Sequence, residues 1–399
     1  MDSAYENKVN WLFNQFPAFQ KVGESAYKPT LENTKKLIEH LNVPIEKMKF
    51  VHVAGTNGKG TTCSIIASAL TESRLKVGMF TSPHIKDFRE RIRINGEMIS
   101  QEEVLAYITT FQSSSFEISP SFFEMTWAMA LAYFYQEKCD IVVVETGLGG
   151  RLDATNVIEP ELSVITNIEL DHVAILGDTR TKIATEKAGI IKQNVPVIIG
   201  ESDEEIEGVF VRAAQERNAP LYFLPENDKV STYEKNQLLA FFAIDILLHN
   251  QPDLASIKQR AMDRLFINTG LYGRNQIYST NPLIIIDAAH NVMGIQRFLD
   301  YIALTYPNKK IRALYGASND KDVKAIVKLF PKKWEYYFTE FGGNRSTEIS
   351  VFKAIAEENK IKSKYFSDSK KAFIEIQESV NEEVVIVVFG SFFLLEKII

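Results

Sequence analysis

Cysteine is scarce in this sequence, which contains only Cys63 and Cys139. Two cysteines are too few for a disulfide framework, and neither belongs to a Cys-x-x-Cys pair of the kind that binds zinc. We therefore expect reduced thiols and a cytoplasmic protein.

An excess of positive charge is also missing. Lysine and arginine together number 45 against 51 aspartate and glutamate residues, which gives a net charge of -6. Proteins that bind nucleic acid by its phosphates present a broad basic surface. The charge balance predicts that nucleic acid is not a partner.

Long apolar runs are absent as well. The longest, residues 384–395, is interrupted by Gly390 and Ser391, and it falls short of the roughly 18 residues that a membrane-spanning helix needs. The N-terminus, Met1–Lys8, carries acids and no apolar run, which argues against a signal peptide. We expect no membrane partner.

The sequence does contain a regular alternation of short β-branched runs and helical patterns, which is typical of an α/β fold with mainly parallel strands. Its 399 residues exceed the roughly 250–300 that one core usually organises, so we expect two domains. The first series of predicted strands is 50–54, 77–81, 140–146, 162–166 and 196–200. The intervening predicted helices are 31–41, with Thr30 as N-cap, 59–73, 121–137, 181–192 and 204–217.

A second, shorter series follows a glycine-rich polar stretch at residues 268–276, where we place the linker. The expected domains are therefore 1–272 and 273–399. Predicted strands of the second domain are 283–288, 311–317, 335–339 and 384–389, and its predicted helices are 292–306, 320–330, 349–359 and 369–379.

The clearest local motif joins an apolar strand to a helix through a glycine-rich loop at residues 51–62. Such a loop points backbone amides and a helix N-terminus at an anion, and Lys59 adds a charge for the phosphates of a nucleotide. It departs from the Walker A pattern, because Val53 replaces a glycine and Gly60 replaces the hydroxyl residue after the lysine. The alternative is a tight structural turn. The residues expected to bind nucleotide are Asn57, Gly58, Lys59, Gly60 and Thr61.

This loop resembles that of the Mur ligase superfamily, and in particular its dihydrofolate synthase/folylpolyglutamate synthase branch. Other segments resemble that branch in the same order along the chain: residues 81–84, 88–92, 121–124, 145–156, 170–172, 186–192, 273–276 and 287–291. The resemblance implies a P-loop ATPase domain, a smaller Rossmann-like domain and a site in the cleft between them. It also implies ligation of L-glutamate to dihydropteroate or a reduced folate, driven by ATP and Mg²⁺ through an acyl phosphate.

By this resemblance Ser82, Glu145 and His172 would hold two Mg²⁺ ions. Ser82 would replace the hydroxyl that is missing at Gly60. Lys187 resembles the lysine that the family carries as a carbamate. The residues alone leave other interpretations open: Glu145 as a strand-terminal acid, His172 as a structural histidine and Lys187 as a solvated lysine.

The resemblance also places the pterin acceptor on two segments. Their aromatic members fit a packed core equally well, because a flat pterin and a core both favour aromatic faces. The expected acceptor-binding residues are Ser121, Phe122, Phe123, Glu124, Leu152, Asp153 and Ala154.

In the second domain, Arg274 and Asp287 match nucleotide-contacting positions, and His290 and Ser391 would shape the glutamate pocket. The family's nucleotide-binding asparagine corresponds to Gln237 in residues 233–240, and the preceding segment, 224–232, is shorter than usual. The adenine contacts are therefore where we expect this sequence to differ from the family.

Two other functions remain open: a Mur-type ligase for another carboxylic acid, and a catalytically silent nucleotide-binding protein. Mur ligases of cell-wall synthesis usually carry about a hundred residues before the phosphate loop, whereas here it begins near residue 55. We expect a monomer with both synthase activities.

Overall fold

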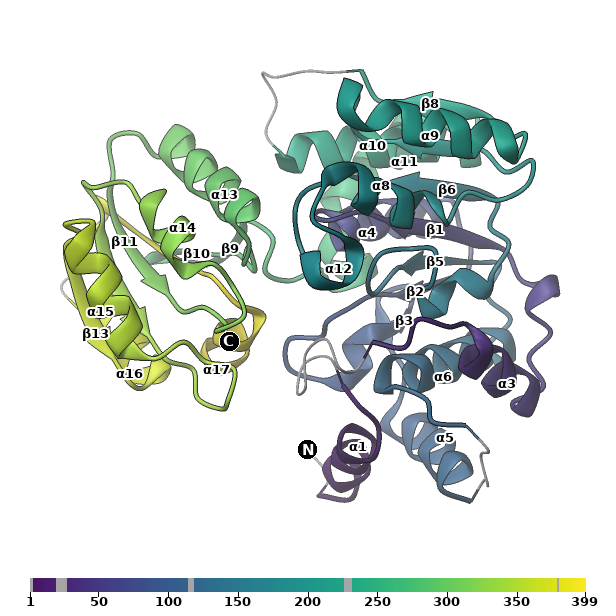
Figure 1. Ribbon diagram of the computed structural model, residues 1–399, viewed down its shortest axis with the longest axis horizontal. Helices are drawn as coiled ribbons and strands as arrows, with labels where there is room; N and C mark the ends of the chain where they lie inside the picture. The colour runs from purple at the N-terminus through teal and green to yellow at the C-terminus, as the bar shows by residue number, and fades with distance from the viewer. Residues whose placement is uncertain (1–2, 19–26, 114–117, 226–231, 379) are drawn as a thin grey trace. The chain divides into compact units, whose positions relative to one another are not determined.

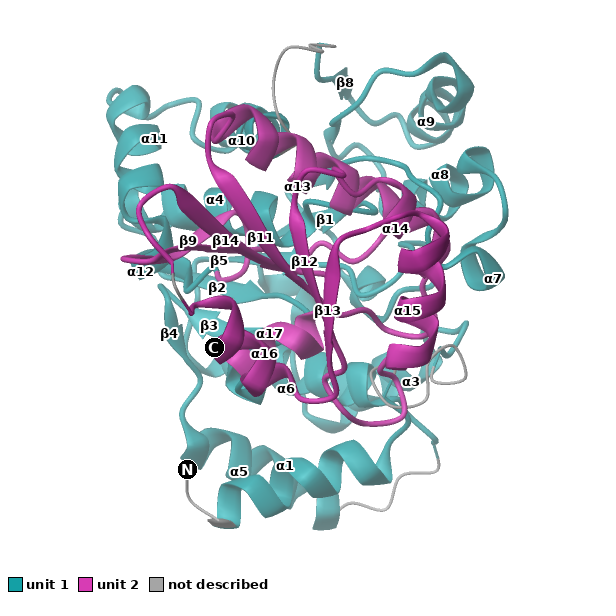
Figure 2. Ribbon diagram, turned by 90° about the vertical axis from the view of Figure 1, so that its left-hand side faces the viewer, with its two compact units in different colours: residues 1–271 teal, residues 272–399 magenta. Residues whose placement is uncertain are grey.

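The computed structural model describes residues 3–18, 27–113, 118–225, 232–378 and 380–399 (Figure 1). The chain forms two compact units, residues 1–271 and 272–399, coloured separately in Figure 2. Each unit has its own sheet and its own apolar core.

Unit 1 is built on an eight-stranded sheet of order β4-β3-β2-β5-β1-β6-β7-β8. β1 lies between β5 and β6 and pairs with both in parallel. The antiparallel pairs are β2 with β3 and β3 with β4, at one edge. The strands are β1 (Phe50–Ala54), β2 (Val77–Phe80), β3 (Ile92–Ile94), β4 (Glu97–Met98), β5 (Ile141–Glu145), β6 (Leu162–Ile165), β7 (Val197–Ile199) and β8 (Leu221–Phe223).

Helices cover both faces of this sheet, which is why β1 and β5 are buried along their whole length. One face carries α4 (Lys59–Glu72), α10 (Thr232–Leu247) and α11 (Leu254–Asp263). Over the other face lie α1 (Ser3–Gln15), α3 (Glu32–His40), α5 (Gln101–Ser113), α6 (Phe122–Gln136), α8 (Arg180–Ala188) and α9 (Glu204–Glu216). Two short helices, α7 (Val173–Leu176) and α12 (Leu265–Thr269), complete the unit.

Unit 2 has a six-stranded sheet of order β13-β12-β11-β14-β10-β9, parallel except for the β9–β10 pair. Its core holds many aromatic residues, packed between the sheet and α13, α14 and α15. The strands are β9 (Gln276–Thr280), β10 (Leu283–Ile286), β11 (Lys310–Tyr315), β12 (Glu335–Thr339), β13 (Ser363–Phe366) and β14 (Val384–Phe389). The helices are α13 (Val292–Thr305), α14 (Val323–Lys328), α15 (Ile349–Glu358), α16 (Ser369–Ile376) and α17 (Phe392–Ile398).

The predicted α/β class and mainly parallel sheets are confirmed, and every predicted strand is present with small shifts at its ends. One predicted helix, 181–192, is too long, because α8 ends at Ala188. The C-cap of α8 is Gly189, where a Cβ would overlap Arg151, so no side chain fits there. The N-cap of α3 is Leu31 rather than Thr30, although the Thr30 hydroxyl accepts a hydrogen bond from Glu32. Ser379, at the end of the predicted helix 369–379, lies outside the described residues.

None of the described helices combines the length and apolar character that crossing a membrane requires. What matters for function is the edge of the unit 1 sheet where β1, β5 and β6 end at Ala54, Glu145 and Ile165. Ligand-binding residues of open parallel sheets gather at this carboxyl edge.

Candidate active site

The phosphate loop follows β1 and leads into α4 (Figure 1). Gly58 is the N-cap of α4 and adopts a left-handed conformation with φ 81°, which glycine reaches without strain. The first backbone amides of a helix have no partner within the helix, so they can bind an anion. Lys59 Nζ donates to the carbonyl oxygens of Gly55, at 3.0 Å, and Thr56, at 3.2 Å. The Lys59 side chain therefore lies over the phosphate loop, where it is predicted to bind the nucleotide phosphates.

The two residues that follow β6 form hydrogen bonds with this loop. Thr166 Oγ1 donates to the carbonyl oxygen of Asn57 at 2.6 Å, and the Asn57 amide donates to Oδ1 of Asn167 at 2.8 Å. A Cβ on Gly55 would overlap the Thr166 hydroxyl, so glycine is required there. Thr61, in the first turn of α4, is buried.

Glu145 is the last residue of β5 and only 4% exposed. Its Oε2 accepts a 3.0 Å hydrogen bond from the backbone amide of Ser82. A Cβ added to Gly60 would lie 3.5 Å from the same oxygen. The structure thus brings together two of the predicted metal ligands, Ser82 and Glu145, with the first turn of α4.

His172, the third predicted metal ligand, is the N-cap of α7 in a left-handed conformation with φ 50°. Its Nε2 lies 3.8 Å from Oδ2 of Asp171. Within the described ranges no three His, Cys, Asp or Glu side chains form a group that could hold a metal by themselves. Magnesium in nucleotide sites commonly takes one or two protein ligands, with phosphate and water oxygens completing its shell. Ser82 and Glu145 are suited to a site of that kind, and His172 stays a predicted third ligand.

Lys187 lies in α8 and is 3% exposed. Burial and, to a smaller extent, the nearby charge of Lys59 lower its pKa, Asp171 and Asp153 act in the opposite direction, and the resulting pKa is about 7. An exposed lysine has a pKa near 10.4. Near neutral pH the Lys187 amine is therefore substantially unprotonated, which excludes the solvated-lysine interpretation.

The first acceptor segment begins α6. Ser121 and Glu124 form a capping box, in which each side chain accepts from the backbone amide of the other. Phe122 is buried and stacks on Phe13 of α1 with ring centres 4.0 Å apart. Phe123 is partly buried, and its ring lies 2.7 Å from where a Cβ on Gly147 would stand. These residues therefore have structural roles, in capping α6 and in packing the core, in addition to the acceptor binding that is predicted for them.

The second acceptor segment, 152–154, is held by the buried Asp153. Its carboxylate accepts from the Leu148 amide at 2.8 Å, and from the amide and hydroxyl of Thr155 at 3.0 and 2.5 Å. Burial raises the pKa of Asp153, and these hydrogen bonds oppose that rise. Thr155 also contacts the buried ring of His52 at 2.8 Å. Leu152 is partly buried and Ala154 buried beside this network.

Unit 2 groups its predicted residues at the ends of β10 and β14. Asp287 is buried and accepts from the backbone amides of Asn275 and Ala289. Burial raises its pKa, and the charge of Arg274 opposes that rise. The Arg274 guanidinium lies over the Phe392 ring at 5.1 Å, and the His290 ring is 6.0 Å from the same ring. Ser391, the N-cap of α17, accepts from Phe393.

The sequence reasoning did not single out Asn236. A Cβ on Gly58 would overlap the Asn236 carboxamide, so this side chain packs directly against the phosphate loop. The predicted residue, Gln237, is the next residue of α10 and partly buried. Both side chains carry an amide group. The path of α10 determines which of the two faces the phosphate loop, and that residue is Asn236. Most of the shortened segment, residues 226–231, lies outside the described residues.

Asn167 was also missed. Its signal was present, because it comes directly after a predicted strand that neighbours β1 at the carboxyl edge of the sheet.

Two family models match the chain: the Mur ligase middle domain over residues 53–280 and the Mur ligase glutamate ligase domain over residues 273–392. The dihydrofolate synthase/folylpolyglutamate synthase of Bacillus subtilis is 32% identical over 100% of this chain and 99% of its own length.

Solved structures agree. The Escherichia coli FolC protein in complex with DHPP and ADP superposes with a TM-score of 0.85 at 26% identity, over 99% of this chain and 97% of that one. A bifunctional folylpolyglutamate synthase/dihydrofolate synthase with Mn, AMPPNP and L-glutamate bound gives 0.81 at 29% identity, over 98% and 96%.

The match is collinear and covers both units. Together with the glycine-rich loop, the buried Glu145 and the buried Lys187, it identifies the chain as a member of the dihydrofolate synthase/folylpolyglutamate synthase family of Mur ligases.

Proposed function

We propose that this chain ligates L-glutamate to dihydropteroate and to reduced folates, with hydrolysis of ATP to ADP and phosphate. The observation that carries the proposal is the sequence similarity to a dihydrofolate synthase/folylpolyglutamate synthase, which extends over nearly the whole length of both chains. The conservation of geometry with a structure that holds DHPP and ADP supports it.

The chemistry explains why such a site needs a phosphate loop. A carboxylate is a poor acyl donor until one of its oxygens becomes part of a leaving group. Transfer of the γ-phosphoryl group of ATP to that oxygen gives an acyl phosphate and ADP. The amine of glutamate then attacks the carbonyl carbon, and phosphate leaves as the amide forms. Catalysis of this kind depends on positioning and on stabilisation of phosphate charge.

In unit 1, residues 57–61, which include Lys59, would bind the phosphates. Lys59 donates to two loop carbonyls, which keeps its ammonium group at the loop. Asn236 packs on Gly58, and we propose it as a nucleotide-binding residue alongside Gln237. The divalent cation, held by Ser82, Glu145 and His172, would neutralise phosphate charge.

Lys187 is proposed to carry a carbamate. Carbon dioxide reacts with an unprotonated amine, and the depressed pKa of about 7 provides that form near neutral pH. The product would replace a buried amine by a negatively charged group among Asp171, Asp153 and Lys59. Such a charge favours cation binding nearby.

The proposed acceptor site comprises residues 121–124 and 152–154. In unit 2, Arg274 and Asp287 are proposed as nucleotide-binding residues. His290 Nδ1 lies 3.0 Å from the Ala288 carbonyl oxygen. If Nδ1 donates there, Nε2 carries the lone pair and is the nitrogen able to take a proton from the glutamate ammonium. Ser391 would line the glutamate pocket. Cytoplasmic location and a monomeric state stay predictions.

The test is ATP-dependent incorporation of labelled glutamate with dihydropteroate or tetrahydrofolate as acceptor. Product from both acceptors supports the bifunctional assignment, and product from one alone restricts it to that acceptor. ADP release with a cell-wall precursor and not with either folate compound would favour another Mur-type ligase. Nucleotide binding without any product would favour the silent protein.

A further inference from the structure

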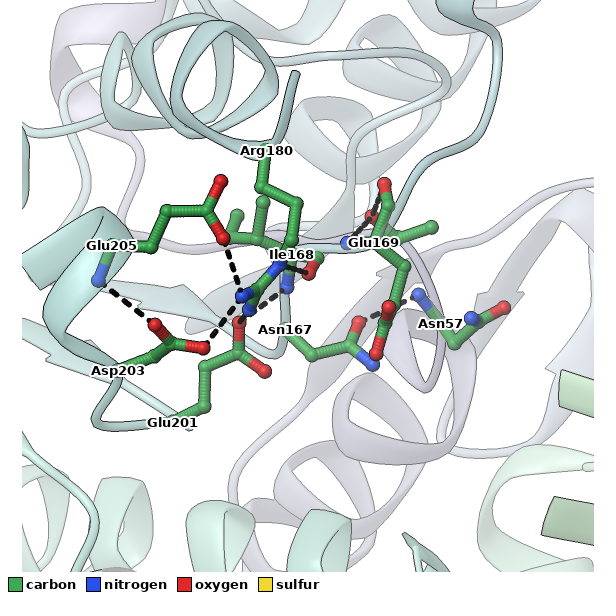
Figure 3. A network of polar contacts seen from close by, with 9 residues as sticks. Asn57, Asn167, Ile168, Glu169, Arg180, Glu201, Asp203 and Glu205 are labelled. Carbon is green, nitrogen blue, oxygen red and sulfur yellow. Dashed lines mark hydrogen bonds and ion pairs between the residues drawn. The ribbon is translucent and has the colours of Figure 1, made fainter. Parts of the chain in front are cut away.

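A charged cluster outside the proposed contacts connects three segments of unit 1, and Figure 3 shows it with the residues that it joins to the phosphate loop. Its centre is Arg180, the first residue of α8, whose side chain is 23% exposed. The guanidinium pairs with Glu201 at 3.1 Å, with Asp203 at 2.5 Å and with Glu205 at 3.0 Å. It also donates from Nε to the carbonyl oxygen of Ile168 at 3.0 Å.

The bond to Ile168 distinguishes this cluster from an ordinary surface ion pair. Glu201 Oε1, which pairs with Arg180, accepts the backbone amide of the same Ile168 at 2.9 Å. One ion pair therefore satisfies both backbone groups of a single loop residue, whose own side chain is fully buried. The planar, multiply donating guanidinium suits this arrangement, which a lysine cannot reproduce.

The residues on either side of Ile168 hold the phosphate loop. Asn167 accepts from Thr56 N through its carbonyl oxygen, at 3.0 Å, and from Asn57 N through its side chain, at 2.8 Å. Glu169 N donates to Thr56 Oγ1 at 3.0 Å, and that hydroxyl donates to the Glu169 carbonyl oxygen at 3.3 Å. Four hydrogen bonds thus connect residues 167 and 169 to two successive residues of the loop.

The same segment then continues through Leu170 and Asp171 to His172. We propose that Arg180 is a positioning residue for the nucleotide site: with Glu201 it fixes Ile168, and so sets residues 167–172 against the phosphate loop. Arg180 itself touches neither nucleotide nor metal in this account. The inference rests on the proposed ATP-dependent function.

Electrostatics keeps the cluster charged. Partial burial lowers the pKa of Arg180, but the hydrogen bond to Asp203 and the charges of Glu201 and Asp203 outweigh it and raise that pKa. The same pairing lowers the pKa of Asp203. Arg180 and Asp203 therefore both stay charged at neutral pH.

The outer half of the cluster provides a matched control. Glu205, whose side chain is 50% exposed, pairs with Arg180. Among the hydrogen bonds of the described residues in this cluster, none joins Glu205 to Ile168. Exposed pairs contribute little to stability. The variant Glu205→Gln therefore removes one of the carboxylates that pair with Arg180. It leaves both hydrogen bonds to the backbone of Ile168 in place.

The experiment measures the affinity of the purified full chain for a non-hydrolysable ATP analogue with Mg²⁺, by calorimetry, together with the melting temperature. Arg180→Met and Glu201→Gln are expected to weaken binding about tenfold, a loss of about 1.4 kcal/mol. Arg180→Lys should give an intermediate loss, and Glu205→Gln wild-type affinity. The KM for glutamate should be unchanged in all four variants.

A double-mutant cycle separates positioning from general destabilisation. Asn167→Ala removes the acceptor for the Asn57 amide, so if Arg180 acts through this segment, adding Arg180→Met should weaken binding little further. Full additivity of the two losses, or wild-type affinity in Arg180→Met, would overturn the proposal. So would a loss in Glu205→Gln equal to that in Arg180→Met. Because wild-type nucleotide binding is the reference, these results are independent of whether wild-type protein forms a folate product.

Discussion

The backbone amide of Ser82 donates a 3.0 Å hydrogen bond to Oε2 of Glu145, across two neighbouring parallel strands of the unit 1 sheet. The bond orients a buried carboxylate at the carboxyl edge of the sheet and places it beside the first turn of α4. A carboxylate so placed is suited to holding a cation next to bound phosphates.

Glu145→Gln tests the charge of that carboxylate, because the amide keeps an oxygen for the Ser82 hydrogen bond. We expect kcat to fall by about 10²-fold or more, as when one electrostatic stabiliser of the transition state is lost. The Mg²⁺ concentration needed for half-maximal activity should rise. The measurement is ADP release over a Mg²⁺ titration.

The matched control for Glu145→Gln is Glu137→Gln. Glu137 pairs with Lys76 in a partly exposed ion pair. The two residues precede β5 and β2, at the opposite ends of these strands from Glu145 and Ser82, so the loss of the Glu137 charge should leave both quantities unchanged. Wild-type magnesium dependence in Glu145→Gln would remove Glu145 from the metal site.

Gly58→Ala tests the shape of the phosphate loop. A methyl group at φ 81° costs about 1 kcal/mol or more, and it would displace the Asn236 carboxamide. We expect the KM for ATP to rise about tenfold or more.

Gly208→Ala on α9 is the comparison for Gly58→Ala, since a Cβ there meets nothing within 4 Å. It should stabilise the protein by about 1 kcal/mol through helix propensity and leave the KM for ATP unchanged. An unchanged KM in both variants would show that the glycine at 58 is dispensable.

Lys187 gives a prediction for the pH dependence of stability. Its pKa is about 7 in the folded protein and near 10.4 in an unfolded chain. Between these values the unfolded state binds more protons, so this residue makes stability rise with pH across that window. In Lys187→Met the rise should be absent. Denaturant unfolding under CO₂-free buffer at pH 7 and pH 9.5 measures the difference, and equal slopes in both proteins would contradict the assignment.

Two tyrosines in the unit 2 core should respond in opposite ways to loss of their hydroxyl group. The hydroxyl of Tyr315 is buried without a hydrogen-bond partner among the described residues, whereas that of Tyr336 donates to the Pro331 carbonyl oxygen at 3.2 Å. Tyr315→Phe should be neutral or stabilising, and Tyr336→Phe should cost about 1 kcal/mol. Chemical denaturation of both variants is the check, and a larger loss from Tyr315→Phe would contradict it.

The sequence was sufficient for the α/β class because buried parallel strands such as 141–145 are continuous apolar runs that few other structures explain. Five strands were missed: β3, β4, β8, β9 and β13. The last four contain no fully buried residue and so leave no such run. β3 is mostly buried but short, and Arg93 interrupts its apolar residues. The end of α8 was missed although its C-cap, Gly189, is a residue type that commonly ends helices.

The same distinction applies to the site. Lys59, Glu145 and Lys187 carry their chemistry in recognisable local motifs. Asn236 packs on Gly58, 178 positions away, and Arg180 bonds to Ile168, 12 positions away, and no local pattern marks either of them. Asn167 did carry a local signal, because it directly follows a predicted strand. The sequence could suggest an amide in α10, but only the helix path selects the one that packs on Gly58.

The most direct test of the central claim follows the acceptor's carboxylate oxygens. Dihydropteroate labelled with a heavy oxygen isotope in its carboxylate is incubated with the protein, ATP, Mg²⁺ and glutamate, and the released phosphate is analysed by mass spectrometry. An acyl phosphate predicts one labelled oxygen in each phosphate released with product, and no product from Lys59→Ala. Unlabelled phosphate formed in step with product would contradict the account.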